Sequence, residues 1–248
     1  MKTNKWYIFD LDGTLLSDKN KIPQKTIDFL LNIKEDGHKL GILTGRPFEV
    51  IKECIEKKLL KHFDFISGYN GSKTLHENTL VSNEFKFSDI RLPKGNFDLT
   101  VPIGNHLYIS GDTRLYHVSK RYDFVVKELN ELGNNSINMI RLIFDNNSET
   151  KEYFSKLMDS NLKDEFNITM STRVFILITK KGSSKASTIE LILKNNEVIY
   201  FGDSENDIDV FLMDEVFTVA PLNANSRIKE LANIVLTTTN NESLFIEI

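Results

Sequence analysis

Short apolar segments alternate with amphipathic ones in the first third of this chain, and this alternation constrains the fold more than any other feature. Three apolar runs, residues 6–9, 39–43 and 63–67, are separated by two stretches of helical periodicity, about residues 23–36 and 48–60. Runs of this kind are typical of strands buried on both faces of a sheet. Strand–helix repeats of this length predict parallel strands joined by right-handed crossovers.

The same alternation returns after Gly182, whereas the middle of the chain has a different pattern. Short β-like runs dominate there, with two helical stretches at about residues 119–132 and 148–160. We therefore predict an α/β fold, with a Rossmann-like parallel-sheet core that carries helices on both faces. Residues 1–80 and 181–248 would form this core, and residues 81–180 would form an inserted α+β cap domain.

The amino-acid composition argues against two classes of binding partner, nucleic acids and membranes. Hydrophobic residues make up 40% of the 248 residues and charged residues 27%, which is ordinary for a soluble globular protein. A net charge of -4 with scattered basic residues argues against a nucleic-acid partner. No apolar stretch reaches the roughly 18 to 20 residues that span a bilayer, so no membrane partner is expected. Cys54 is the only cysteine, which excludes an intramolecular disulfide and predicts a reduced, cytoplasmic setting.

Two carboxylates follow the first predicted strand directly. Asp10 and Asp12 end the apolar run and precede Gly13, and the period of two in a strand would direct both side chains to one side. Neighbouring carboxylates repel each other unless a cation or a proton lies between them. Taken alone, these residues fit either half of an active site or an acidic turn that closes a hairpin.

Three further polar clusters fall where the fold would bring them to the same place. They are Thr44-Gly45-Arg46 after the second strand, Lys185 at the start of a helix, and the run from Gly202 to Asp207 after a later strand. Ligands of open parallel sheets bind beyond the carboxyl ends of the strands. The four clusters together therefore favour an active site over a simple turn.

This set of residues suits phosphoryl transfer from a phosphomonoester. Asp10 is the expected nucleophile, and Asp12 is the expected acid and base for the leaving alcohol and the water. Lys185 would stabilise developing negative charge. Mg²⁺ prefers oxygen ligands, which Asp10, the main-chain carbonyl of Asp12 and Asp203 would supply.

The other polar residues of the clusters have supporting roles in this prediction. The hydroxyl of Thr44, the amide of Gly45 and the side chain of Asn206 would bind phosphate oxygens, although a threonine here could instead cap the next helix. Asp207 belongs to the metal site, where it would orient the waters of the metal or pair with the lysine. Arg46 is predicted either to contact substrate or to form a structural ion pair.

The motifs FDLDGTLL, LTGR, GSSKAS and GDSENDIDV, in this order, resemble those of the haloacid dehalogenase superfamily. Tyr69-Asn70-Gly71 and residues 219–224 look like the Cof-type sugar phosphatase branch. The resemblance covers about residues 5–80 and 180–240. It implies a magnesium-dependent phosphatase with Asp10 as nucleophile, Asp12 as acid and base, and a large, C2-type cap inserted after the third strand.

We therefore expect an enzyme that hydrolyses small phosphorylated metabolites, sugar phosphates first, through an aspartyl-phosphate. A bulky cap would exclude large substrates and leave room for a sugar. Two alternatives stay open: a sugar phosphomutase, and a signalling or binding protein that holds phosphoaspartate without turnover. The second alternative has no use for an acid at Asp12.

Overall fold

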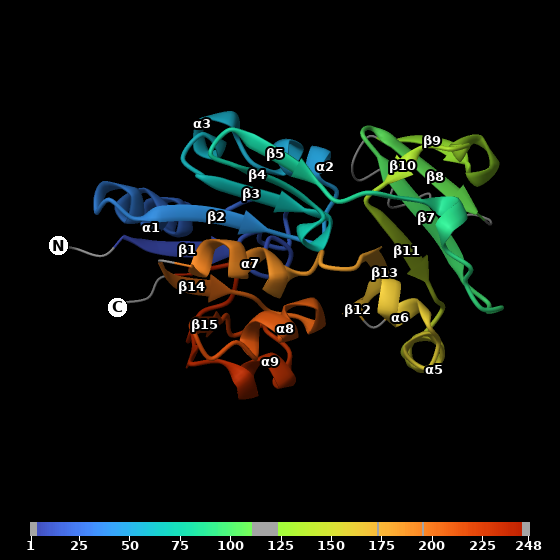
Figure 1. The fold of residues 1–248 in the computed structure, drawn as a ribbon. Coiled ribbons are helices and arrows are strands. Elements are labelled where there is room, and N and C mark those ends of the chain that lie inside the picture. The colour runs from blue at the N-terminus through green and yellow to red at the C-terminus, as the bar shows by residue number, and fades with distance from the viewer. Residues whose placement is uncertain (1–3, 111–123, 173, 195, 245–248) are drawn as a thin grey trace.

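The computed structural model describes residues 4–110, 124–172, 174–194 and 196–244, in which two large sheets lie side by side (Figure 1). The larger sheet has eight strands, which come from the N-terminal and the C-terminal parts of the described chain. Its strands, in sheet order, are β16 (Ile234–Val235), β15 (Val216–Ala220), β14 (Glu197–Phe201), β1 (Lys5–Phe9), β2 (Lys39–Leu43), β3 (Phe65–Gly68), β4 (Lys73–His76) and β5 (Thr79–Ser82).

The six strands from β16 to β3 are parallel, and β4 and β5 extend this sheet as an antiparallel hairpin. The predicted α/β fold with a parallel core is therefore confirmed. The hairpin was not predicted as part of the core sheet. The domain division at residues 80 and 181 stays a prediction, and β5 ends close to its first boundary.

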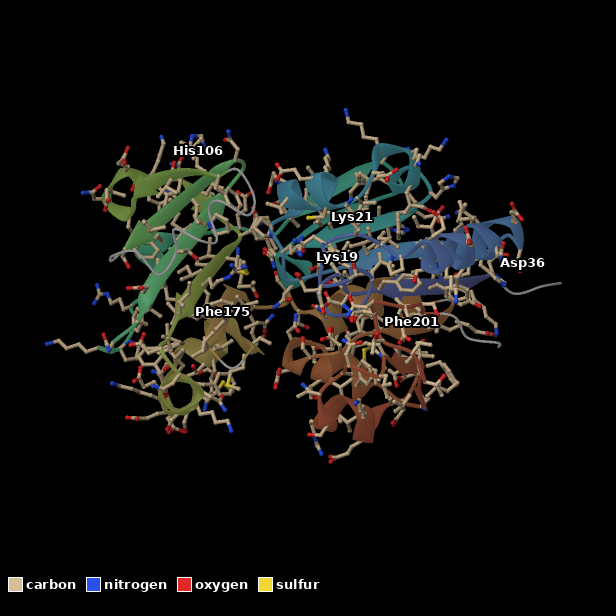
Figure 2. The ribbon with its side chains drawn as sticks, turned by 180° about the vertical axis from the view of Figure 1, so that it is seen from behind. Lys19, Lys21, Asp36, His106, Phe175 and Phe201 are labelled. Atoms are coloured by element: carbon tan, nitrogen blue, oxygen red, sulfur yellow. The ribbon has the colours of Figure 1, made fainter. Side chains whose placement is uncertain are left out.

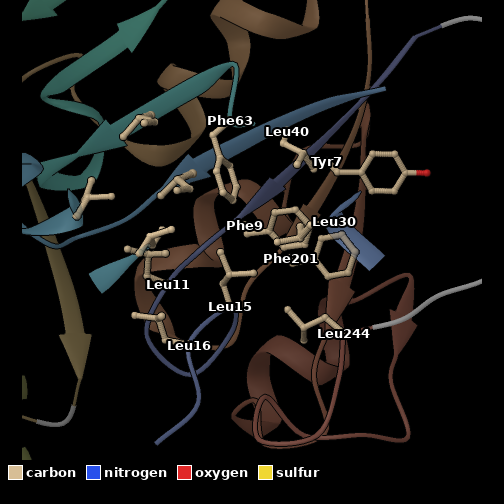
Figure 3. Packing of buried hydrophobic residues seen from close by; sticks show 14 of the residues in the cluster. Tyr7, Phe9, Leu11, Leu15, Leu16, Leu30, Leu40, Phe63, Phe201 and Leu244 are labelled. Atoms are coloured by element: carbon tan, nitrogen blue, oxygen red, sulfur yellow. The ribbon is translucent and has the colours of Figure 1, made fainter. Parts of the chain in front are cut away.

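Helices cover both faces of the core sheet. Tyr7 and Phe9 of β1 pack on one face with the helices α1 (Gln24–Glu35), α2 (Phe48–Cys54) and α3 (Lys57–Leu60). Trp6 and Ile8 point to the opposite face, where α7 (Lys185–Leu193), α8 (Ile208–Phe211) and α9 (Ser226–Leu231) lie. Figure 3 shows the first of these clusters, in which Phe9 and Phe201 stack at 4.5 Å between ring centroids.

The second sheet lies within the predicted cap. Its six strands, in sheet order, are β12 (Phe166–Thr172), β13 (Phe175–Lys180), β11 (Met139–Ile143), β7 (Asp98–Ile103), β8 (His106–Ser110) and β9 (Val125–Glu128). The helices α5 (Asn147–Met158) and α6 (Leu162–Glu165) accompany it, and β6 (Phe85–Lys86) pairs with β10 (Ser136–Ile137). Short 3-10 turns complete the elements: η1 (Tyr69–Gly71), η2 (Phe87–Asp89), η3 (Leu129–Leu132) and η4 (Glu205–Asp207).

The two faces of the cap sheet have different partners. Ile140 of β11 and Ile178 of β13 pack with Leu157 of α5 in a hydrophobic cluster that belongs to the cap alone. Met139 and Leu177 point the other way and join the hydrophobic cluster of the core domain. The cap sheet therefore contacts the core through side chains next to the carboxyl ends of the core strands.

The chain enters and leaves the cap at two adjacent points. The side-chain amide of Asn83, just after β5, donates to the hydroxyl of Ser183 at 2.6 Å. The main-chain amide of Asn83 donates to the carbonyl of Ser72 at 2.7 Å, and the Ser72 hydroxyl donates to the Asn83 carbonyl at 2.6 Å. Hydrogen bonds thus tie both crossings to each other and to the core.

Two predicted helices differ from the structure. The helix predicted at residues 119–132 is wrong for residues 125–132, which form β9 and η3, while residues 119–123 lie outside the described residues. The two adjacent valines of β9 favour strand, and β9 pairs in parallel with β8. The helix predicted at residues 48–60 is divided into α2 and α3 by Ile55, which is extended and buried in the core.

Within the described ranges, no helix combines the length and the apolar character needed to cross a membrane.

Asp64 gives the fold a test of its pH dependence. Its carboxylate accepts hydrogen bonds from Lys34 at 2.7 Å, Lys39 at 3.1 Å and the Leu40 amide at 3.0 Å. Burial alone would raise the pKa of Asp64, but these bonds lower it below its usual value. The ionised form is therefore favoured in the folded state, and its contribution to stability is present above about pH 4 and lost as the pH falls below that.

We expect Asp64→Asn to reduce the free energy of unfolding at pH 7 by about 1 kcal/mol. The difference from wild type should shrink toward zero near pH 2, because the pH has then passed through the lowered pKa of Asp64 and both proteins carry a neutral group. Urea unfolding followed by circular dichroism at the two pH values measures this. An equal difference at both values would contradict the assignment.

Candidate active site

Asp10 and Asp12 lie in the loop after β1. The strand ends at Phe9, and the amide of Asp10 still donates to the carbonyl of Phe201 at 2.9 Å. Asp10 is buried, whereas the side chain of Asp12 is 52% exposed. The predicted reason for their proximity, alternation along a strand, is therefore wrong, because a turn places both carboxylates.

Lys185 is buried at the first position of α7, where it bridges two carboxylates. Its ammonium nitrogen lies 2.9 Å from Oδ1 of Asp10 and 2.6 Å from Oδ1 of Asp207. Burial alone would lower the pKa of Lys185, but the two carboxylates raise it. The lysine is therefore a permanent cation inside the site and not a solvated surface charge.

Asp207 has hydrogen bonds to both of its carboxylate oxygens. Oδ1 accepts from Lys185 and from the Tyr200 hydroxyl at 2.6 Å, and Oδ2 accepts from the amides of Asp203 and Ser204, each at 3.0 Å. Of the two roles predicted for Asp207, pairing with the lysine is the one visible in the structure. These bonds also fix the loop that carries Asp203.

Asp203 faces the turn after β1. Its Oδ1 accepts a hydrogen bond from the Thr14 hydroxyl at 3.0 Å. Gly13 has a φ of +74°, and a Cβ atom built on it would lie 2.2 Å from Oδ2 of Asp203. The side-chain amide of Asn223 donates to the carbonyl of Gly13 at 2.7 Å and holds this turn from the other side. A glycine is therefore required here for both backbone conformation and space.

The cluster contains more negative than positive charge. Asp10, Asp203 and Asp207 can each offer a carboxylate oxygen within 4.8 Å of the others. Burial raises the pKa of Asp10 to about 7. The positive charge of Lys185 reduces this shift, and the negative charges of Asp207 and Asp12 add to it. Burial and then the charges of Asp10 and Asp207 raise the pKa of Asp203 well above its usual value. Buried carboxylates that repel one another in this way fit a hard divalent cation.

Arg46 forms an ion pair with Asp12. Its Nε donates to Oδ2 of Asp12 at 2.6 Å, and its Nη2 contacts Oδ1, so the pair is bidentate. The guanidinium also contacts Asn20 and Cys54, and Arg46 is only 4% exposed. Of the two predicted roles, substrate contact or ion pair, the structure shows the ion pair.

Thr44 and Gly45 lie beside residues from three other segments. The Thr44 hydroxyl accepts a hydrogen bond from the Arg46 amide at 3.2 Å. The N-cap residue of α2 is Pro47, so Thr44 does not cap this helix. A Cβ atom on Gly45 would lie 3.1 Å from Asn70, 3.5 Å from Leu177 of the cap and 3.6 Å from Asn206. The fold thus brings together the predicted phosphate-binding residues, directly under the cap.

Asn70 has a left-handed backbone conformation within this cluster. It is buried and has a φ of +53°, as does the preceding Tyr69. The Asn206 side-chain amide lies 3.5 Å from Oδ1 of Asn70, and the Asn70 main-chain amide donates to the Thr44 carbonyl at 2.9 Å. Left-handed backbone at two non-glycine residues is uncommon and concentrates at functional sites.

Three supporting residues had no role in the sequence prediction. Thr14 orients Asp203, Tyr200 donates to Asp207, and Asp209 accepts from the Ala186 amide at 3.2 Å, which holds the start of α7. Thr14 and Asp209 stand inside the motif segments, which was the available signal. Tyr200 is an apolar-looking residue of a buried strand, so no pattern in the sequence indicates its hydrogen bond.

Comparison with known proteins identifies the family. The family model described as haloacid dehalogenase-like hydrolase matches residues 7–248. The chain belongs to this family. The family and the enzyme class predicted from the motifs are thereby confirmed.

Relatives with established names extend over nearly the whole chain. A 5-amino-6-(5-phospho-D-ribitylamino)uracil phosphatase of Bacillus subtilis is 26% identical, and the match covers 96% of this chain and 91% of that protein. A phosphomannomutase of Triticum aestivum is 21% identical over 92% of this chain and 94% of its own length. Both are similar in sequence, and they carry different activities.

A solved structure shows the same fold. A protein described as a HAD subclass IIB sugar phosphatase superposes with a TM-score of 0.73 at 22% identity, covering 94% of this chain and 93% of its own. This similarity extends over the segment predicted as the cap, so both sheets belong to the shared fold.

Gly13 provides a test of the site geometry. We expect Gly13→Ala to reduce the affinity for Mg²⁺ at least about tenfold, because the new Cβ atom overlaps the Asp203 carboxylate. Calorimetric titration of Mg²⁺ measures this. Gly37→Ala is the matched control, since Gly37 has a φ of +86° with no atom near its Cβ position.

Both substitutions impose left-handed backbone on alanine, which costs about 1 kcal/mol of stability in each protein. Only the substitution at Gly13 should weaken metal binding. Equal Mg²⁺ affinity in the two variants would contradict the placement of Asp203.

Proposed function

We propose that this protein is a magnesium-dependent phosphatase that hydrolyses small phosphorylated metabolites, with sugar phosphates as the first candidates, through an aspartyl-phosphate. The observation that carries the proposal is the environment of Asp10. One of its oxygens is held by Lys185, and the residue lies beside Asp203. A buried carboxylate fixed in this way is oriented for attack on phosphorus.

In the first half of the reaction, a carboxylate oxygen of Asp10 attacks phosphorus and the bond from phosphorus to the alcohol oxygen breaks. Asp12 gives a proton to this leaving oxygen, so the alcohol departs neutral. Its 52% exposed side chain, next to the loop end, is compatible with reaching the substrate. Lys185 stays next to Asp10 and balances charge that develops on the transferred group.

In the second half, Asp12 accepts a proton from water while the water oxygen attacks phosphorus. The bond from phosphorus to Asp10 breaks, which releases inorganic phosphate and restores the carboxylate. The same residue serves first as acid and then as base, as the proton balance of the two steps requires. Both oxygens of Asp12 face Arg46 in the structure, so proton transfer requires Asp12 to leave this pair.

Mg²⁺ would be held by Asp10, Asp203 and the main-chain carbonyl of Asp12. The excess of carboxylates in the cluster and the raised pKa values of Asp10 and Asp203 support this assignment. Asp207 would support the metal site without binding the ion directly, because its oxygens already accept four hydrogen bonds. When bound, the ion supplies charge neutralisation for the phosphoryl oxygens.

The phosphoryl oxygens would be bound by Thr44, Gly45 and Asn206. The Thr44 hydroxyl accepts one hydrogen bond from the Arg46 amide and keeps its own proton to donate. The Gly45 amide and the Asn206 side chain lie beside it, and Leu177 of the cap limits the space above. The substrate class follows from this enclosure and from the relatives that act on phosphorylated small molecules.

A panel of phosphorylated metabolites tests this proposal, with release of inorganic phosphate followed for glucose 6-phosphate, mannose 1-phosphate and related compounds. Because a phosphomannomutase is similar in sequence, transfer of the phosphoryl group within a sugar is the alternative reaction that the assay must detect. An isomerised sugar phosphate without phosphate release would overturn the phosphatase and support a mutase. A stable phosphoaspartate without turnover would support a signalling protein.

We expect Asp10→Asn to reduce kcat by a factor on the order of 10⁴ or more, because the amide is not a nucleophile. Circular dichroism should show an unchanged fold. Asp12→Asn should accumulate at most a phosphoenzyme, detectable by intact-protein mass spectrometry after acid quench, because the water then lacks its base. Full turnover in Asp10→Asn would exclude covalent catalysis by this residue.

We also expect strict dependence on a divalent metal. Protein treated with EDTA should show no phosphate release, and MgCl₂ should restore it, because the carboxylates otherwise repel the anionic substrate. Thermal unfolding with and without Mg²⁺ should show a higher Tm in its presence. Undiminished activity of the metal-free protein would contradict the metal site.

A further inference from the structure

A cavity of about 830 Å³ lies on the core domain between α1, α2 and α3, and two of its lining residues, Asn20 and Cys54, contact the guanidinium of Arg46. Lys21, which lines it, is labelled in the rear view of Figure 2. Its apolar wall consists of side chains from the loop before α1, from α1, from the junction between α2 and α3, and from α3: Ile22, Ile27, Leu31, Ile55 and Leu59. The volume falls in the range of small-molecule sites, about 300–1,000 Å³.

The polar wall of this cavity is strongly basic. Its lysines are Lys21, Lys52, Lys57, Lys58 and Lys61, and the opposing carboxylates are Glu53 and Glu56. Only Lys58 of these lysines forms an ion pair with a carboxylate among the described residues, at 2.9 Å from Glu56. Such a concentration of positive charge is unexpected in a chain of net charge -4, and it is complementary to an anion.

The shape and chemistry of the lining indicate what kind of anion would fit. Among the described residues that line the cavity, His62 alone carries a ring, so stacking of a nucleotide base has little support. An apolar wall opposite a basic wall instead suits a molecule with a hydrocarbon chain and a charged head. The concave form accommodates one chain, whereas a membrane requires an exposed apolar face.

Two residues of the lining connect the cavity to the active site. Asn20 accepts a hydrogen bond from Nη2 of Arg46 at 3.2 Å, and Sγ of Cys54 lies 2.5 Å from Nη1. Nη2 also contacts Oδ1 of Asp12, and Nε of the same guanidinium donates to Oδ2 of Asp12. One buried arginine therefore contacts both the lining of the cavity and the proposed acid and base.

We propose that this basic cavity binds a single-chain amphipathic anion and that the bound anion draws Arg46 away from Asp12. Its chain would lie on the isoleucines and leucines, and its head group would lie among the lysines. Asp12 must leave Arg46 to transfer a proton, so an occupied cavity favours the active arrangement. The effect on catalysis rests on the proposed phosphatase function, whereas binding does not.

Decyl sulfate, below its micelle concentration, is the probe, because a phosphatase does not hydrolyse it. Calorimetric titration into the magnesium-loaded protein should show one site that persists in saturating inorganic phosphate, which occupies the catalytic site. Sodium sulfate and decanol, which each lack one half of the probe, should bind at least about tenfold more weakly. Equal binding of either compound would overturn the amphipathic class.

Matched double variants locate the site. Lys57→Gln with Lys61→Gln should weaken binding of decyl sulfate about tenfold or more, because two cations of the basic wall are lost. Lys151→Gln with Lys163→Gln, on exposed positions of the cap helices, should bind as wild type does. Equal loss in both double variants, or in neither, would overturn the assignment to this cavity.

Cys54 reports occupancy independently, since it lines the cavity and is the only cysteine of the chain. Decyl sulfate should slow its alkylation by iodoacetamide several-fold, as measured by mass spectrometry. Unchanged alkylation, or association of the protein with anionic vesicles without binding of monomeric probe, would contradict the proposal.

The catalytic effect is measured separately. Decyl sulfate should raise kcat for phosphate release in wild type several-fold and should have no effect in the Lys57/Lys61 double variant. Binding without any change in kcat would overturn the coupling through Arg46. A protein that binds the probe but hydrolyses no phosphomonoester would overturn the proposed function and leave the binding site in place.

Discussion

The ammonium group of Lys185 is the interaction on which the rest of the site depends. It lies between Asp10 after β1 and Asp207 in η4, so one cation joins three separate segments of the chain. Removal of one partner from such a buried set costs about 3–5 kcal/mol, because the remaining charges lose their compensation. The position of Asp203 depends on it in turn, since the amide of Asp203 is held by Asp207.

The two carboxylates of the first loop have opposite surroundings although they are two residues apart. Asp10 is buried beside a lysine that cannot move far, and Asp12 is half exposed beside an arginine that also contacts other residues. A nucleophile benefits from a fixed position, whereas a group that both gives and takes a proton must move. The division of roles proposed for them thus corresponds to the difference in burial between the two carboxylates.

Much of the fold and site could be predicted because both depend on local pattern and on strand ends. Apolar runs predicted the parallel core, and motif order predicted that Asp10, Asp203 and Lys185 belong together. The contact of Arg46 with Asp12 could not be selected over substrate contact, because an arginine side chain reaches in several directions from one backbone position. The strand β9 was predicted as helix, because the strand preference of its two adjacent valines is a weak local signal and its pairing with β8 joins residues far apart in the sequence.

The paired crossings between core and cap have a mechanical consequence. Asn83 and Ser183 are bonded to each other, and Asn83 is bonded to Ser72 of the core, so the two connections behave as a single pivot. A rotation of the cap about this pivot would leave these hydrogen bonds in place, whereas a sideways shift would strain them. Such a rotation would carry Leu177 away from Gly45 and open the space above the phosphate-binding residues.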